Sequence, residues 1–334
     1  MLPEIVRPVD LCLPSGALNP AALGWSRRAL HRANLRTVPL SSRAATWSRT
    51  KRREHWGINT PDHLIALTVN SLNYAAAHQV WILDRSDGTV IEESAIVPLA
   101  RHVELPETAF GGPVRALTRD LAIAVDTEDG NTRLRAKTPR VRLDLHVPIP
   151  PESLGVVIPW SDRQFQYTLK SSALPVSGRL EIDDADTTVG PDAWANVDHG
   201  RGRWPYSTIY TSAVASGAVA GVRTGLHLGG LWTEGTGSTE NALIIDSRVH
   251  YLPEETVWTF DADSPTGTWM IEGDRVEATL EPFHHGSVST NLGIVATTTT
   301  GVCGTWHGWA ADDDGGRHRL DGLVGWAEFT SNRW

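Results

Sequence analysis

Short runs in which apolar and polar residues alternate recur along most of the chain. Segments 63–70, 77–84 and 141–147 are clear examples. Alternation with a period of two is typical of strands with one buried face. The Asp87-Gly88 pair after the second segment predicts a tight hairpin turn. Further strands are expected at 121–125, 132–136, 164–170, 176–182, 207–214, 218–228, 242–245, 256–260, 269–272, 276–280, 292–298, 301–309 and 320–329.

Many short strands separated by turn signals are typical of sandwiches and barrels. They are too numerous for one small barrel, so we expect two packed barrels that divide somewhere near residues 175–195. The repeated prolines of segment 1–60 predict an irregular N-terminal arm, with one short helix around residues 20–30. No longer amphipathic helix is indicated.

Length, charge and cysteine content narrow the class of protein. With 334 residues, the chain is long enough for two domains, and its net charge of −9 argues against a nucleic-acid partner. The one notable basic cluster, Lys51-Arg-Arg53, is predicted to be a solvated loop. Cys12 and Cys303 lie far apart and predict no disulfide framework. We see no secretion signal and no apolar run of ~18–20 residues, so we expect no membrane span and a cytoplasmic protein.

Two segments, 196–206 and 226–241, concentrate acids, basic groups and large aromatic rings among glycines. The chain has fourteen Trp against five Phe and five Tyr, and Trp combines a large ring with an N–H donor. We therefore expect the two segments to form the polar floor of an aromatic pocket. The candidate residues are Asp198, His199, Arg201, Arg203, Trp204, Tyr206, His227, Trp232, Glu234, Glu240 and Asn241, joined from the first half by Tyr167 and Lys170.

Three of these residues are the catalytic candidates. Burial can raise the pKa of Asp198 or Glu240 until the carboxyl group donates a proton, and Tyr206 could relay one. Neighbours on a strand point to opposite faces, so Asp198 and His199 could act together only across a bend, which Gly200 and Gly202 would permit. The alternative is that Asp198 only holds a loop, paired with a nearby arginine.

The other candidates are assigned to substrate binding, and each also has a structural interpretation. Arg201 and Arg203 could bind a carboxylate or an enolate, or could close one end of a barrel. Tyr167 and Lys170 point to opposite faces of one strand, and Lys170 could simply form an ion pair. The glycine loop at 235–238 lacks the lysine of a phosphate-binding loop, and the histidines at 284, 285 and 307 lack metal-ligand spacing. We therefore expect neither a metal nor a cofactor.

The same motifs resemble a bacterial family known as domain of unknown function 2804. The similarity includes Leu18-Asn19, Gly24-Trp-Ser-Arg27, segment 165–170, Leu174-Pro175, segments 198–206 and 232–241, and the final Arg333-Trp334. At position 199 the family more often has Trp or Gly, which argues against an essential role for His199.

That family is similar to the double-lipocalin proteins, which include carotenoid 1,2-hydratases and the Diels–Alderases of decalin-type natural products. The resemblance implies an all-β protein of two packed antiparallel lipocalin-like (calycin) β-barrels with a hydrophobic small-molecule ligand. Applied to this chain, it implies an N-terminal arm and first barrel in residues 1–185 and a second barrel, with the main polar site, in 186–334.

Two functions from different classes remain open. The first is a cofactor-independent enzyme that hydrates, isomerises or cyclises an apolar, isoprenoid- or polyketide-like substrate. The second is a non-catalytic carrier or sensor of a hydrophobic ligand, since barrels of this kind often only bind. A third, structural interpretation makes the 196–241 network part of the scaffold alone. The oligomeric state is not predicted.

Overall fold

The computed structural model describes residues 2–36, 41, 47–261, 264, 266–291 and 295–333. Within these ranges the chain folds almost entirely into antiparallel sheets, and the one helical element with described bounds is a 3-10 turn, η1 (Pro20–Ala22). The all-β class is therefore confirmed. The short helix expected around residues 20–30 is only this turn, because the chain enters a sheet at β2 (Trp25–Ser26). No helix in the described ranges is long and apolar enough to cross a membrane.

Two sheets enclose the first core. The seven-stranded sheet has the order β16 (Ala185–Val189), β15 (Ser177–Ile182), β12 (Val141–Pro148), β11 (Asn131–Lys137), β10 (Ala122–Glu128), β9 (Val114–Leu117) and β8 (Val103–Glu104). The eight-stranded sheet has the order β2, β13 (Leu154–Pro159), β14 (Phe165–Pro175), β17 (Trp194–Arg203), β4 (Thr50–Asn59), β5 (His63–Ser71), β6 (Ala75–Asp84) and β7 (Val90–Pro98). Aliphatic side chains from both sheets, such as Leu145 and Ile65, pack in this core.

The ten-stranded sheet curls around a second core. Its order is β21 (Arg248–Tyr251), β20 (Ala242–Ile245), β19 (Val222–Gly230), β18 (Ser207–Val219), β27 (Leu323–Arg333), β25 (Ala296–Ala311), β24 (Val276–Asn291), β23 (Trp269–Gly273) and β22 (Val257–Thr259), and β26 (Arg317–Arg319) pairs with β25. Trp269 and Trp306 are fully buried in its core.

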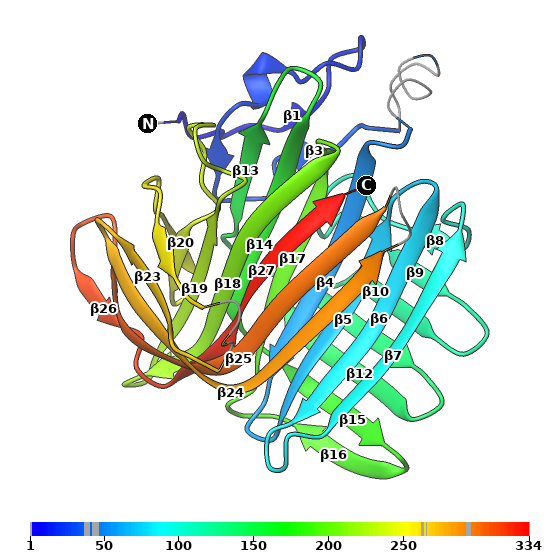
Figure 1. Cartoon of the computed structure of the whole chain (residues 1–334), viewed down its shortest axis with the longest axis vertical. Coiled ribbons are helices and arrows are strands. Elements are labelled where there is room, and N and C mark those ends of the chain that lie inside the picture. Colours follow the sequence, from blue (N-terminus) through cyan, green and yellow to red (C-terminus); the bar gives the residue numbers. More distant parts are fainter. Residues whose placement is uncertain are drawn as a thin grey trace.

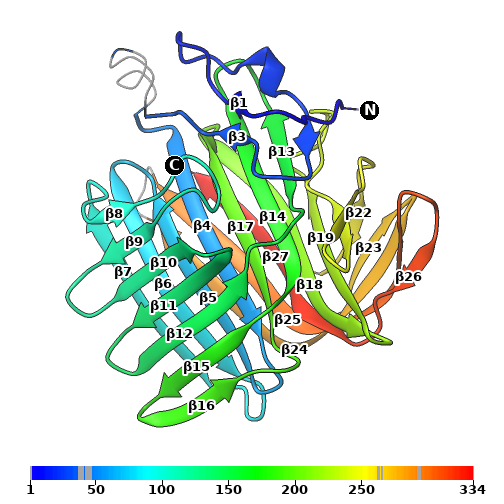
Figure 2. The ribbon, with the colours of Figure 1, turned by 180° about the vertical axis from the view of Figure 1, so that it is seen from behind.

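The eight-stranded sheet is the middle layer of the molecule. One of its faces covers the first core, and the other packs against the ten-stranded sheet, as Figures 1 and 2 show. At this second contact the side chain of Asn59 donates to the backbone oxygens of Ser216 and Val324, at 2.9 and 3.0 Å. Because both faces are covered, every residue of β14 from Phe165 to Leu174 is buried.

The N-terminal arm lies across one end of the two sheets that enclose the first core (Figure 2). It is irregular up to residue 36 apart from η1, β2 and a two-stranded parallel pair, β1 (Val9–Asp10) and β3 (His31–Arg32). Leu11 and Leu35 are buried in the first core, so the arm is part of the packed structure.

The expectation that segment 1–60 is irregular throughout is wrong beyond Thr50, where β4 begins. Lys51, predicted to lie in a solvated loop, is only 2% exposed. β7, β13 and β17 were also not predicted as strands. β13 and β17 bury both faces, so their polar residues do not mark a solvent face and the alternation that identifies an ordinary strand is lost. β7 is an edge strand with one exposed face, so this reason does not apply to it. Residues 292–294 of the strand expected at 292–298 lie outside the described residues, as does Trp334.

The division into domains at residue 185 stays a prediction. By sheet pairing, the chain passes from the sheets around the first core to the ten-stranded sheet after Arg203. β16 hydrogen-bonds to β15, and β17 hydrogen-bonds to β14 and β4, so both strands complete the sheets around the first core. The ten-stranded sheet begins with β18.

Candidate functional site

β17 distributes the predicted site residues over both faces of the middle sheet. The strand runs from Trp194 to Arg203 in unbroken register with β4, so Asp198 and His199 point in opposite directions. The bend expected at Gly200 and Gly202 does not occur. The two glycines instead leave room for the side chain of Gln166, since a Cβ atom at either position would lie within 2.7 Å of its amide group.

Asp198, Lys170 and Glu240 meet between the middle sheet and the ten-stranded sheet, and we call them the inter-sheet cluster. Lys170 Nζ lies 3.1 Å from Asp198 Oδ2 and 3.9 Å from Glu240 Oε2. Lys170 and Asp198 are direct neighbours on β14 and β17, and Glu240 comes from the loop before β20. The side chains of Lys170 and Glu240 are 5% and 2% exposed, whereas Asp198 keeps 25% of its surface accessible. Asp198 is therefore the member of the cluster with the most accessible surface.

The two carboxyl groups of this cluster have opposite pKa shifts. Burial raises the pKa of Glu240, and the nearby Lys170 offsets this only in part. Burial also acts to raise the pKa of Asp198, but Lys170, Arg53 and His55 outweigh it and hold this pKa well below its usual range. Lys170 lies closer to Asp198, and its own pKa is raised because the two carboxylates outweigh its burial. The environment therefore makes Glu240 the weaker acid of the two and Asp198 the stronger.

A cluster of aromatic rings centred on Trp232 adjoins Glu240. Trp232 donates its ring N–H to Glu240 Oε2 at 3.1 Å. The Trp232 ring centroid lies 5.5 Å from those of Trp160 and Trp204 and 5.0 Å from that of Tyr210. Trp204 donates in turn to the Gln166 side chain at 2.6 Å. The predicted combination of an acid with large rings is therefore present around Glu240.

Several residues near the cluster were not predicted from the sequence. Thr168 donates to Asp198 Oδ1 at 3.1 Å. Arg53 and Glu328 also act electrostatically on Asp198 and Lys170, and burial raises the pKa of Glu328 above its ordinary value. Thr168, at i−2 from Lys170 on the predicted strand, could have been found from the period of two. Glu328 could not, because it becomes a neighbour only through the pairing of β27 with β18.

The remaining candidates from 206–241 differ in their positions. His227 is buried near Lys170, and burial followed by this positive neighbour lowers the pKa of its imidazole to about 3. Asn241 accepts from the Gly229 N–H at 2.8 Å and has a structural role. Glu234 lies exposed in the glycine loop, and Tyr206 is 41% exposed with the Arg49 guanidinium over its ring. The structure does not bring these last two candidates to the cluster.

Four further candidates, Tyr167, His199, Arg201 and Arg203, lie on the opposite face of the middle sheet, where they face the first core and the arm. Glu54 accepts there from His199 Nδ1 at 2.8 Å and from Arg201 Nη2 at 3.1 Å. The Tyr167 ring packs edge-on against His199, and Arg203 donates to the Gly16 backbone oxygen. Because β17 stays extended, these four residues and Asp198 lie on opposite faces of the sheet and do not share one pocket, contrary to the prediction.

Metal-ligating side chains do not gather into a site in the described part of the chain, where no three His, Cys, Asp or Glu residues could hold an ion. The turn at 312–316 joins β25 and β26 as a hairpin: Asp312 accepts from the Gly316 N–H at 2.7 Å and contacts His318 at 2.8 Å.

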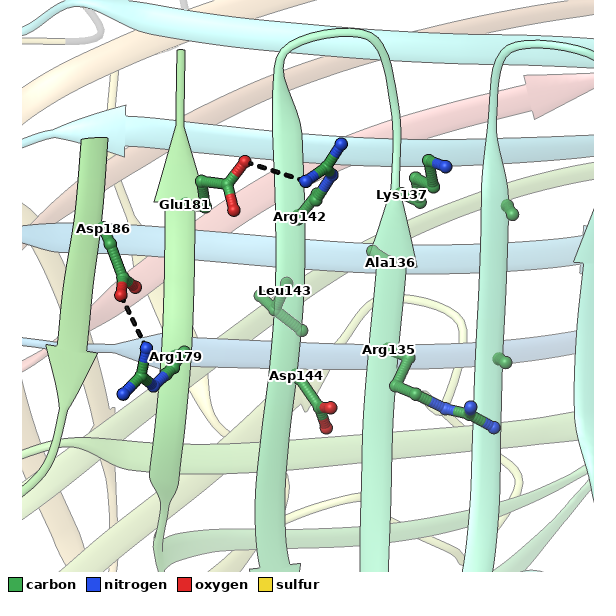
Figure 3. A pocket seen from close by; sticks show the side chains of 11 residues that line it. Arg135, Ala136, Lys137, Arg142, Leu143, Asp144, Arg179, Glu181 and Asp186 are labelled. Carbon is green, nitrogen blue, oxygen red and sulfur yellow. Dashed lines mark hydrogen bonds and ion pairs between the residues drawn. The ribbon is translucent and has the colours of Figure 1, made fainter. Parts of the chain in front are cut away.

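A separate hollow of about 480 Å³ lies on the outer face of the seven-stranded sheet (Figure 3). Two ion pairs lie within its lining, Arg142 with Glu181 at 3.4 Å and Arg179 with Asp186 at 2.8 Å. It is open to solvent and remote from the inter-sheet cluster, so we assign no chemistry to it.

Fold and site together define a β-protein of two curled units with a buried acid–base cluster where they meet. The chain belongs to the family described as domain of unknown function (DUF2804), whose model matches residues 3–334. This confirms the resemblance noted from the motifs. No curated protein matches the sequence at a significant level.

The solved structures with a similar fold include the following three. Kievitone hydratase from Nectria haematococca is 7% identical with a TM-score of 0.50, and CghA, crystallised with Sch210972, is 14% identical with a TM-score of 0.51. In both comparisons, 85% of this chain and 88% of the other are covered. A protein from Nitrosomonas europaea, described provisionally as AttH, is 12% identical with a TM-score of 0.53, covering 84% of this chain and 91% of that one. At these identities the likeness establishes the fold alone.

Proposed function

We propose that the protein is a cofactor-independent enzyme that acts on an apolar, isoprenoid- or polyketide-like substrate by acid–base catalysis at the inter-sheet cluster. The observation that carries the proposal is that two carboxyl groups near one ammonium group have pKa values shifted in opposite directions. Glu240 is favoured as the neutral acid and Asp198 as the ionised base. Environments that separate two pKa values in this way assign acid and base roles in enzymes.

Glu240 is the proton donor in this proposal. Trp232 donates to its Oε2 atom, and the buried Oε1 atom has no hydrogen-bond partner within the described structure. Oε1 is therefore the oxygen that carries the acid proton and gives it to an alkene or carbonyl group. The π faces of Trp204 and Trp232 would stabilise positive charge that develops on the substrate.

Asp198 is the proton acceptor. Lys170 and Thr168 hold its two carboxylate oxygens, at 3.1 Å each, so the group is both ionised and oriented. Its accessible surface lets it take a proton from a water molecule in a hydration, or from carbon in an isomerisation or cyclisation. Kievitone hydratase is named for a hydration, which supports including that reaction class for this fold.

The test begins with the ligand that co-purifies with the protein. Native mass spectrometry identifies it, and the released ligand is incubated with fresh wild-type protein and with the Glu240→Gln and Asp198→Asn variants. Glu272→Gln is the matched control, because Glu272 is an exposed residue of β23. We expect wild type and control to give a hydrated or isomeric product, and each variant to be slower by about 10²–10⁴-fold, the usual contribution of a general acid or base.

Two other outcomes contradict the proposal in different ways. Full turnover by both variants would show that catalysis does not use these carboxyl groups. A ligand recovered unchanged after long incubation with wild-type protein would favour the carrier or sensor.

A further inference from the structure

Arg52 is a buried arginine that the proposed catalysis does not use. Consecutive residues of β4 point to opposite faces, so Arg53 faces the ten-stranded sheet and Arg52 faces the first core. Arg52 is 9% exposed, and its Nη2 atom donates to Ser71 Oγ at 3.1 Å. Its Nε and Nη1 atoms are buried and have no hydrogen-bond partner among the described residues.

The charge of Arg52 is also not compensated locally. Glu54, the carboxylate on the same face, already accepts from His199 and Arg201. No carboxylate oxygen of a described residue is in an ion pair with Arg52. Its charged neighbours are two cations, Arg201 and Arg36, against Glu107, whose electrostatic effect is smaller than that of either cation. Burial and then these cations lower the pKa of Arg52 to about 10, so it is still positive at neutral pH. A buried, unpaired charge is strongly unfavourable.

Two further unpartnered groups share this face. In the strand register, Arg52 lies opposite Ser71 on β5, and His78 on β6 pairs with Val69 two residue pairs further along, in the row of Glu54. His78 is 1% exposed, and neither ring nitrogen has a partner in the part of the chain that the structure describes. Tyr167 lies in the same row as Arg52 across Arg201, but its buried hydroxyl, which has no partner among the described residues, lies on the other side of its strand, against Gly155 of β13. A neutral imidazole can donate one hydrogen bond.

We propose that the end of the first core binds a small, singly charged oxyanion, with a carboxylate as the best match, against the Arg52 guanidinium. An ordered water could accept from Nε or Nη1, but it would leave the positive charge uncompensated. A monoanion would neutralise the single uncompensated positive charge. The N–H donors of a guanidinium group match the two oxygens of a carboxylate in geometry. The ligand must be small, because buried aliphatic side chains fill the rest of this core. This site is independent of the inter-sheet cluster.

Ligand-dependent stability tests the site in the intact chain. Protein dialysed against chloride is unfolded by urea at increasing acetate, at constant ionic strength and pH 7. A parallel series uses acetamide, which has the shape of acetate without its charge, and another uses inorganic phosphate. Above the dissociation constant, each tenfold rise in acetate should raise the folding equilibrium constant about tenfold. Acetamide should have no comparable effect, and phosphate should act more weakly because its second charge is not matched.

Variants assign the effect to Arg52. Arg52→Met, which keeps the length of the side chain and removes its charge, should abolish the acetate response. Arg140→Met is the matched control, because Arg140 is an exposed arginine of the same half of the chain, paired with Asp183, and its response should equal that of wild type. Equal responses of wild type to acetate and acetamide, or an acetate response retained in Arg52→Met, would overturn the proposal. The wild-type comparison decides the question even if Arg52→Met does not fold.

Discussion

Replacement of Lys170 by Met tests the energetics of the inter-sheet cluster. The substitution keeps the apolar stem of the side chain and removes the ammonium group that lies 3.1 Å from Asp198. At this distance, and at an effective dielectric constant of about 20, the attraction of the two charges is worth about 5 kcal/mol. Removal of one partner of a buried pair costs about 3–5 kcal/mol, because the other charge stays buried and unpaired. Asp198 retains 25% of its surface, so we expect the lower end, about 3 kcal/mol.

Urea unfolding of Lys170→Met and of the double variant Lys170→Met/Asp198→Asn measures this cost. A neutral amide at position 198 needs no counter-charge, so the double variant should recover most of the lost stability. The pH dependence gives a second readout. The pKa of Asp198 is depressed in the folded state, so its contribution is present above the unfolded pKa of about 3.9 and is lost as the pH falls towards the folded value. In the single variant this acid dependence should weaken, because Arg53 and His55 alone then lower the pKa of Asp198.

The result that refutes this reasoning is a small effect. A loss below about 1 kcal/mol in Lys170→Met would mean that the pair behaves like an exposed ion pair. A double variant as unstable as the single one would mean that the cost comes from packing and not from charge.

Two further predictions concern close packing and burial. Gly57→Ala should destabilise the protein by about 1–3 kcal/mol in the same unfolding assay, because its Cβ would lie 1.9 Å from the Trp326 ring between the sheets; an unchanged stability would show that the contact is loose. Cys12 and Cys303 are buried, which raises the pKa of their thiols to about 11 and about 12. Both should resist a thiol-specific reagent at pH 8 until the protein is unfolded, and rapid labelling of the native protein would contradict their burial.

Much of the fold could be predicted because many strands have a single covered face. The alternation at 141–147, for example, corresponds closely to β12 (Val141–Pro148), whose exposed residues alternate with buried ones. The middle sheet was harder to predict. β4 carries Lys51, Arg52 and Arg53 in succession, which suggests a solvated loop until it is known that both faces of the strand are covered.

The candidate site could also be predicted only in part. The high density of polar and aromatic residues in segments 196–206 and 226–241 indicated a site there, and these segments supply Asp198 and Glu240. The assignment of His199 to the same pocket depended on a bend. Glycines at 200 and 202 permit a bend, but here they accommodate a crossing side chain in a straight strand. Only the tertiary packing distinguishes these two uses of glycine.

The central claim is that Glu240 is protonated at neutral pH beside an ionised Asp198. Infrared difference spectroscopy between wild type and Glu240→Gln tests this most directly, because a protonated carboxyl group and a carboxylate absorb at different frequencies. At pH 7, we predict that wild type shows a protonated carboxyl band that is missing in Glu240→Gln and remains in Asp198→Asn. A difference spectrum that contains only a carboxylate band for Glu240 at pH 7 would contradict the account, because Glu240 could then not be the acid.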